Sequence, residues 1–206
     1  MLRSQIPPGA PLLALFEKWA LSDDRGSALL EFAIVLPLLV VFVVGIFDFS
    51  GAFNQKQKIE QAAQEGAILA GAQAMSDIQS IAGSNPASLQ AVVTAVFNSL
   101  AGSGVLASGT CAPPGTPSGP VGLTWTYTIS GCSAALSTDQ LVITINRGWV
   151  CPAPCASGPP VAVGTIVTVQ YPYHWRFNSV IQLLIPGASY AGLTQITESA
   201  TVHNQL

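Results

Sequence analysis

The hydrophobic residues of this chain are concentrated in one long run near its N-terminus. Residues 28–47 form a stretch of 20 residues in which only Glu31 is charged. In a helix such a stretch rises by about 30 Å, which matches the hydrocarbon core of a bilayer. The alternative is a core helix of a soluble domain, which normally carries a polar stripe, but residues 32–44 contain no polar side chain. The pattern predicts a transmembrane helix over residues 27–48.

A helical pattern of a different character continues beyond the apolar run. Small residues recur there at spacings of three and four and form one stripe along the helix: Ile59, Ala62, Ala63, Gly66, Ala67, Ala70 and Ala74. Because small side chains allow backbones to approach closely, we expect the stripe to pack on either the chain's own sheet or the helix of a neighbouring subunit. We predict one helix from Leu29 to about Met75, with residues 49–76 as its extension beyond the membrane.

The rest of the chain predicts a second helix and several strands. Gly83 and Pro86 break the long helix, and residues 87–100 then repeat apolar positions at helical spacing, with Ser84 or Asn85 available as N-cap. Gly, Ser and Pro dominate residues 101–120, which predicts a loop. Alternating polarity predicts strands over residues 123–129, 141–146, 164–171 and 194–203, and we expect a short helix over residues 178–185.

These elements predict an α+β fold, in which a long N-terminal helix and a second short helix accompany an antiparallel sheet of about four strands. We expect Tyr173, His174 and Trp175 to form a packed strand end rather than a site. The two histidines, His174 and His203, are the candidate general bases, and neither lies in a nucleophile or metal motif. The sequence therefore does not favour an enzyme.

Charge is sparse in the C-terminal part of the chain. The formal net charge is -3 without a basic patch, which argues against nucleic acid as a partner. Residues 66–206 contain five charged side chains, namely Asp77, Asp139, Arg147, Arg176 and Glu198. Because few ionic groups then need desolvation, this composition is typical of an exported domain that packs against similar neighbours. Poor solubility is the alternative interpretation.

The four cysteines all lie between residues 111 and 155. An even number clustered in an exported, loop-rich segment indicates disulfides, with three possible connectivities. Local spacing favours Cys111 with Cys132 and Cys151 with Cys155. Zinc is the rival ligand, but it prefers Cys-x2-Cys pairs or nearby histidines, which the sequence lacks. We expect no metal and no cofactor.

The segment around the apolar run resembles the TadE-like family, pilin-like components of the tight-adherence (Flp) pilus system. The resemblance covers residues 25–70 and rests on Gly26-x-x-x-x-Glu31-Phe32, on Gly45-x-x-Asp48-Phe49, on Gln57, and on the Ala-rich motif at residues 62–67. Residues 169–173 and 193–202 are similar to the last strands of the family. No useful similarity is visible between residues 75 and 163.

The resemblance implies that a prepilin peptidase cleaves between Gly26 and Ser27 and so removes residues 1–26 as a cytoplasmic leader. Glu31 would then pair with the new amino terminus of an adjacent subunit, whereas the simpler interpretation places its carboxylate among the lipid headgroups. Pro37 cannot donate a backbone hydrogen bond and predicts a local kink. In pilins such a site can loosen on assembly, although membrane helices also tolerate proline.

The resemblance further implies a minor pilin that helps to initiate or regulate pilus assembly through helix packing. Its expected partners are the prepilin peptidase, other pilin-like subunits and the inner-membrane platform. We expect a single-pass protein of the bacterial inner membrane, with a cytoplasmic N-terminus because the cysteines favour a periplasmic C-terminus. Residues 77–206 would form the periplasmic domain, with a disulfide-bearing insertion at residues 101–160. The alternative is a membrane-anchored binding or adhesion module that is not processed as a pilin.

Overall fold

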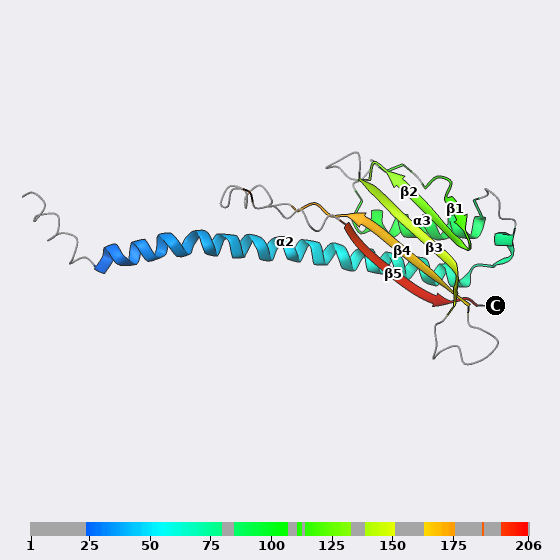
Figure 1. The fold of residues 1–206 in the computed structure, drawn as a ribbon, viewed down its shortest axis with the longest axis horizontal. Coiled ribbons are helices and arrows are strands. Elements are labelled where there is room, and N and C mark those ends of the chain that lie inside the picture. The colour runs from blue at the N-terminus through cyan, green and yellow to red at the C-terminus, as the bar shows by residue number, and fades with distance from the viewer. Residues whose placement is uncertain are drawn as a thin grey trace, which may run out of the picture. The chain divides into compact units, whose positions relative to one another are not determined.

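The computed structural model describes residues 24–79, 85–106, 111–112, 114–132, 139–150, 163–175, 187 and 195–205. The chain divides into two compact units, Met1–Phe47 and Asp48–Leu206, and each is described by itself. Helix α2 (Asp24–Ala72) includes residues of both units, and the short 3-10 helix η1 (Ser76–Gln79) and helix α3 (Ala87–Gly102) follow it (Figure 1). The predicted helix at residues 178–185 lies outside the described residues.

In the N-terminal unit, α2 presents hydrophobic side chains all around. Every described side chain from residue 26 to residue 40 is exposed, and the helix from Gly26 to Ala72 is long and apolar enough to cross a membrane. A continuous exposed apolar surface of this kind is unfavourable in water and is typical of a lipid-embedded helix. The long apolar helix therefore supports a membrane-anchored protein.

The C-terminal unit is built on a five-stranded antiparallel sheet whose strands follow one another in chain order, β1-β2-β3-β4-β5. The strands are β1 (Ser118–Val121), β2 (Thr124–Ser130), β3 (Gln140–Val150), β4 (Val163–Pro172) and β5 (Gln195–His203). The α+β prediction is confirmed, and the sheet has one strand more than the four expected. Strand β1 lies where a loop was predicted, because its four residues include Gly119 and Pro120 and show no alternation.

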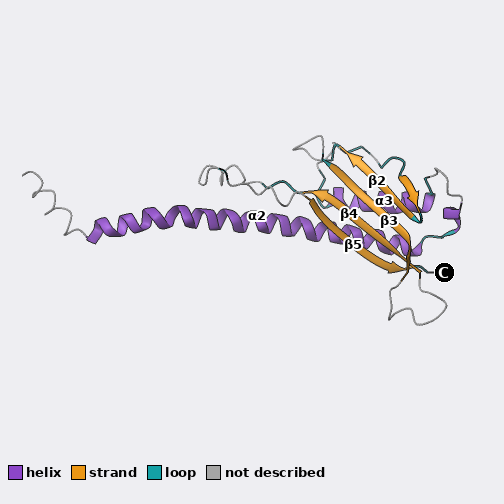
Figure 2. Ribbon diagram, in the orientation of Figure 1, coloured by secondary structure: helices purple, strands orange, loops and turns teal. Residues whose placement is uncertain are grey.

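Helices α2 and α3 lie on the same face of the sheet (Figure 2). Buried side chains from both helices and from strands β2, β3 and β4 form the hydrophobic core. The stripe of small residues packs into this core: Ile59, Ala62, Ala63, Gly66, Ala67 and Ala70 are buried. A Cβ placed on Gly66 would lie 2.4 Å from Val96 Cγ2 of α3 and 3.3 Å from Val167 Cγ1 of β4. Of the two alternatives for the stripe, the structure shows packing within the same chain. Ala74 lies beyond the end of α2 and is exposed.

The start of α3 is capped differently from the prediction. Pro86 occupies the N-cap and makes no side-chain capping bond, and the predicted cap Asn85 instead accepts a hydrogen bond from Tyr127 Oη at 2.8 Å. Asp77 of η1 takes over the capping role, because its carboxylate accepts hydrogen bonds from Ser88 N–H and Ser88 Oγ–H, both at 2.9 Å. The Asn85 prediction was therefore wrong, and Ser84 lies outside the described residues.

The outer face of the sheet is polar but carries no charge among the described strand residues. Strand pairing aligns one row of hydroxyl residues across all five strands: Ser118, Thr126, Thr144, Thr168 and Ser199. The alternation of apolar and polar residues along the strands therefore gives the sheet a hydrophobic inner face and a hydroxyl-rich outer face, as expected for an antiparallel sheet that is covered on one side.

Candidate functional site

The cleavage and assembly residues predicted from the sequence lie on the N-terminal part of α2. Ser27 and Glu31 are four residues apart on one side of the helix, and Ser27 Oγ donates a hydrogen bond to Glu31 Oε1 at 3.5 Å. Gly26, Ser27 and Glu31 are all exposed. The carboxylate of Glu31 therefore points toward the residue that cleavage after Gly26 would make the new amino terminus.

Pro37 lies inside α2, which runs unbroken from Asp24 to Ala72. Because proline has no backbone N–H, the carbonyl of Ala33, four residues earlier, receives no helical hydrogen bond from it. The side chains around Pro37 are exposed on every side of the helix. Pro37 is the single proline of residues 28–47, so within the apolar run the carbonyl of Ala33 is the one that faces a residue without a backbone N–H four positions later.

Two of the four candidate disulfide cysteines lie within the described residues. Cys111 and Cys132 are joined by a disulfide, with 4.3 Å between their Cα atoms. The bond links the segment that leads into β1 to the residue just beyond β2, and Tyr171 Oη of β4 donates a hydrogen bond to the carbonyl oxygen of Cys132 at 2.9 Å. Cys151 and Cys155 lie outside the described residues. Within the part of the chain that the structure describes, no group of three or more His, Cys, Asp or Glu side chains is suited to a metal ion.

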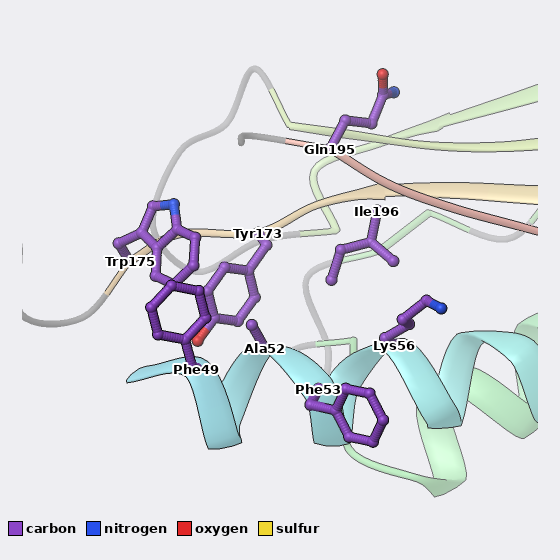
Figure 3. Close-up of a pocket in the computed structure, with 8 residues that line it drawn as sticks. All are labelled: Phe49, Ala52, Phe53, Lys56, Tyr173, Trp175, Gln195 and Ile196. Carbon is purple, nitrogen blue, oxygen red and sulfur yellow. The ribbon is translucent and has the colours of Figure 1, made fainter. Parts of the chain in front are cut away.

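An aromatic hollow that sequence reasoning did not predict lies in the C-terminal unit, where the first turns of its α2 segment meet the end of β4 and the start of β5 (Figure 3). Its lining residues are Phe49, Ala52, Phe53, Lys56, Tyr173, Trp175, Gln195 and Ile196. The Trp175 ring packs edge-on against Phe49 and Tyr173, with ring centroids 5.5 and 5.1 Å apart. Tyr173 and Trp175 thus pack as expected from the sequence and also line this hollow, whereas His174 between them is exposed and was wrongly included in that packed strand end.

Tyr173 anchors the floor of the aromatic hollow to the helix. Its hydroxyl donates a hydrogen bond to the carbonyl oxygen of Asp48 at 3.2 Å, and both residues are buried. A Cβ on Gly51 would lie 3.1 Å from the same hydroxyl oxygen, so the glycine allows the strand end to approach the helix closely. At the rim, Lys56 Nζ forms an ion pair with Glu198 Oε1 at 3.4 Å. Nearby, His174 Nε2 contacts Asp139 Oδ2 at 2.5 Å.

A buried arginine ties the sheet to the end of α2. The Arg147 side chain is fully buried, and its Nη2 donates a hydrogen bond to the carbonyl oxygen of Gln73 at 2.9 Å, just beyond the helix terminus. A cation at this position interacts favourably with the C-terminal end of a helix. Burial lowers the pKa of Arg147, while the nearby Asp77 carboxylate opposes that shift. The surroundings of Arg147 indicate a structural role.

Comparison with protein families identifies the segment that carries the predicted assembly residues. Residues 26–67 match the family model of TadE-like proteins. The match begins at Gly26, contains Glu31 and Pro37, and ends at Ala67 in the buried stripe. The match is consistent with a TadE-like protein of the tight-adherence pilus system. TadE-like pilin proteins are a structural, non-enzymatic kind of protein. Neither the curated proteins nor the solved structures that were searched gave a match to the chain.

The TadE-like segment has two different surroundings in the structure. Its first part, up to residue 47, exposes most of its hydrophobic side chains, whereas Ile59, Ala63 and Ala67 in its last part are buried against the core. The family match therefore covers an apolar helical segment together with the part of the same helix that the folded unit packs around. The five strands lie outside the matched residues.

Proposed function

We propose that this chain is a minor pilin or pseudopilin that helps to initiate or regulate the assembly of tight-adherence pili. The observation that carries the proposal is the match of residues 26–67 to TadE-like proteins, on a helix whose apolar run contains a single carboxylate near its start. The chain acts through helix packing in the inner membrane and performs no chemistry. A folded C-terminal unit in addition to the helix supports a component used in small numbers rather than the bulk subunit.

In this proposal, a prepilin peptidase removes residues 1–26 and leaves the ammonium group of Ser27 as the new amino terminus. An ammonium and a carboxylate 4 Å apart attract each other by about 4 kcal/mol at an effective dielectric constant of 20. The Glu31 carboxylate is exposed and already inclined toward Ser27, so the ammonium of an incoming subunit can approach it. Such a pair fixes the axial register between neighbouring helices, because the rest of the apolar run offers no other charge.

The decisive experiment is to sequence the amino terminus of the full chain isolated from membranes, with and without a co-expressed prepilin peptidase. We expect the chain to begin at Ser27 with the peptidase and at Met1 without it. Gly26→Val should remain uncleaved in both cases, whereas Gly45→Val, a change at another glycine of the same helix where an added Cβ meets nothing within 4 Å, should be cleaved normally. A wild-type chain that keeps Met1 with an active peptidase would instead favour a membrane-anchored binding or adhesion module.

A further inference from the structure

The aromatic hollow combines an apolar lining with an exposed aromatic rim. Six of its eight lining residues are apolar or aromatic, and the exceptions are Lys56 and Gln195. Phe49 and Phe53 at the rim expose 59% and 61% of their surface. Exposed aromatic side chains around an apolar depression are costly in water and mark a surface that is covered by a partner.

The position of the rim along the chain indicates what that partner is. Phe49 follows the last residue of the apolar run by two positions, and Phe53 follows Phe49 by one helical turn. Lys56 comes next along α2, so the order from the apolar run outward is aromatic, aromatic, cationic. Aromatic rings and lysines in this order are typical of the boundary between hydrocarbon and water, where rings lie at headgroup level and ammonium groups extend to water.

We propose that the aromatic hollow binds an acyl chain of a phospholipid from the leaflet at the C-terminal end of the apolar run. Phe49, Phe53 and Trp175 then lie at headgroup level and hold the C-terminal unit on the bilayer surface. The proposal rests on membrane anchoring by residues 27–48 and not on removal of the leader, so it can fail while the proposed function stands.

The hollow is formed before any lipid arrives. The Tyr173 bond to Asp48 and the edge-on packing of Trp175 on Phe49 and Tyr173 hold the rings in place. Less conformational entropy is therefore lost when a chain enters. Glu198 neutralises Lys56 at the rim, so binding depends on the apolar chain and only weakly on the charge of the headgroup or on salt.

The test measures tryptophan quenching by phospholipids that carry bromine on their acyl chains. The full-length chain is placed in nanodiscs that contain one copy each, made with brominated or with ordinary phosphatidylethanolamine. The emission of Trp175 is obtained as the difference between the wild type and Trp175→Phe. The emission of Trp149, obtained in the same way, is the control, because Trp149 lies at the opposite end of the β4–β5 pairing, near His203.

We expect brominated lipid to remove most of the Trp175 emission and to leave the Trp149 emission unchanged. Phe53→Ser should reduce the quenching of Trp175. The matched change Ile68→Ser should not, because Ile68 is a similarly exposed apolar residue further along the same helix, outside the hollow. Equal Trp175 emission in both kinds of lipid would overturn the proposal. So would emission that changes only when two copies share a disc, because the occupant would then be a second copy of the chain.

Discussion

At the scale of single residues, buried polar side chains connect the sheet to the ends of the helices. Tyr127 reaches Asn85 just before α3, and Arg147 reaches the carbonyl of Gln73 just after α2. Each bond satisfies a polar group that would otherwise be buried without a partner, and such a loss costs about 1–3 kcal/mol. The orientation of the helices on the sheet therefore depends on a few specific hydrogen bonds as well as on hydrophobic area.

Because of Tyr127, we expect the folded chain to lose stability at alkaline pH. Burial raises the pKa of Tyr127 from 10.0 to about 12. Between these two pH values the folded chain keeps the proton of the Tyr127 hydroxyl, whereas the unfolded chain loses it. The resulting stabilisation is complete below pH 10 and disappears as the pH rises toward 12, a change of about 2–3 kcal/mol. Urea unfolding of the full chain in detergent micelles, repeated between pH 8 and 12, measures this decline.

Tyr127→Phe isolates that contribution. At pH 8 the variant should be less stable by about 1 kcal/mol, since Asn85 Oδ1 loses its donor. Its stability should then decline less than that of the wild type between pH 10 and 12. Parallel declines in the two proteins would show that Tyr127 is not the group responsible.

Glu31→Ala tests the proposed assembly role of the carboxylate. The variant removes the charge without shortening the apolar run, so we expect normal membrane insertion, as judged by carbonate extraction, and loss of co-purification with other pilin-like subunits. Glu60→Ala is the matched control, because Glu60 is an exposed carboxylate of the same helix outside the apolar run. Unchanged pilus output from the Glu31 variant would contradict the pairing with a neighbouring amino terminus.

At the scale of elements, the contact between α2 and α3 depends on the absence of a side chain at Gly66. The two helices approach so closely there that any Cβ would overlap Val96. The neighbouring Ala62, Ala63 and Ala70 are fully buried and extend the same surface. Small residues in this stripe therefore set the distance between the helices, and larger ones would force the core apart.

Gly66→Ala should lower the free energy of unfolding by about 1–3 kcal/mol, because overlap in a packed core outweighs the gain of about 1 kcal/mol in helix propensity. Gly102→Ala is the control at the end of α3, where an added Cβ meets nothing within 4 Å. Its effect should stay within about 1 kcal/mol. Urea unfolding in micelles compares the two, and a neutral Gly66→Ala would show that α3 shifts without cost.

At the scale of the whole molecule, a chain of low charge relies on hydrophobic burial and covalent closure. Charged side chains are few beyond residue 66, and the ion pair Lys56–Glu198 is half-exposed, so it contributes at most about 1 kcal/mol. The disulfide between Cys111 and Cys132 spans 21 residues that include β1 and β2. It constrains the edge of the sheet that is furthest from β5 in the strand order.

Replacing both disulfide cysteines by serine should destabilise the C-terminal unit by about 3 kcal/mol, since an unfolded loop of this length gains that much freedom. Thermal unfolding of the oxidised wild type, the reduced wild type and the double variant in micelles measures the effect. The reduced wild type should resemble the double variant when both are measured under the same reducing conditions. Equal stability of all three would mean that the bond adds nothing to the folded unit.

Local patterns determined the elements of this protein. The uninterrupted apolar run predicts the membrane-compatible helix, small residues at helical spacing predict the stripe that α3 covers, and alternation predicts four of the five strands. Each of these signals depends on residues a few positions apart, which share one face of an element whatever the rest of the chain does. The resemblance to TadE-like proteins is also a local signal, because it rests on the order of residues along one helix.

Only the tertiary structure decided which distant residues meet. Tyr173 and Asp48, which anchor the aromatic hollow, are 125 positions apart, and Arg147 and Gln73 are 74 apart. Asp77 replaced the predicted cap of α3 because folding places a stronger acceptor beside Ser88. Such contacts depend on how whole elements pack together. The periodicity of residues within one element does not reveal which residue of another element it will contact.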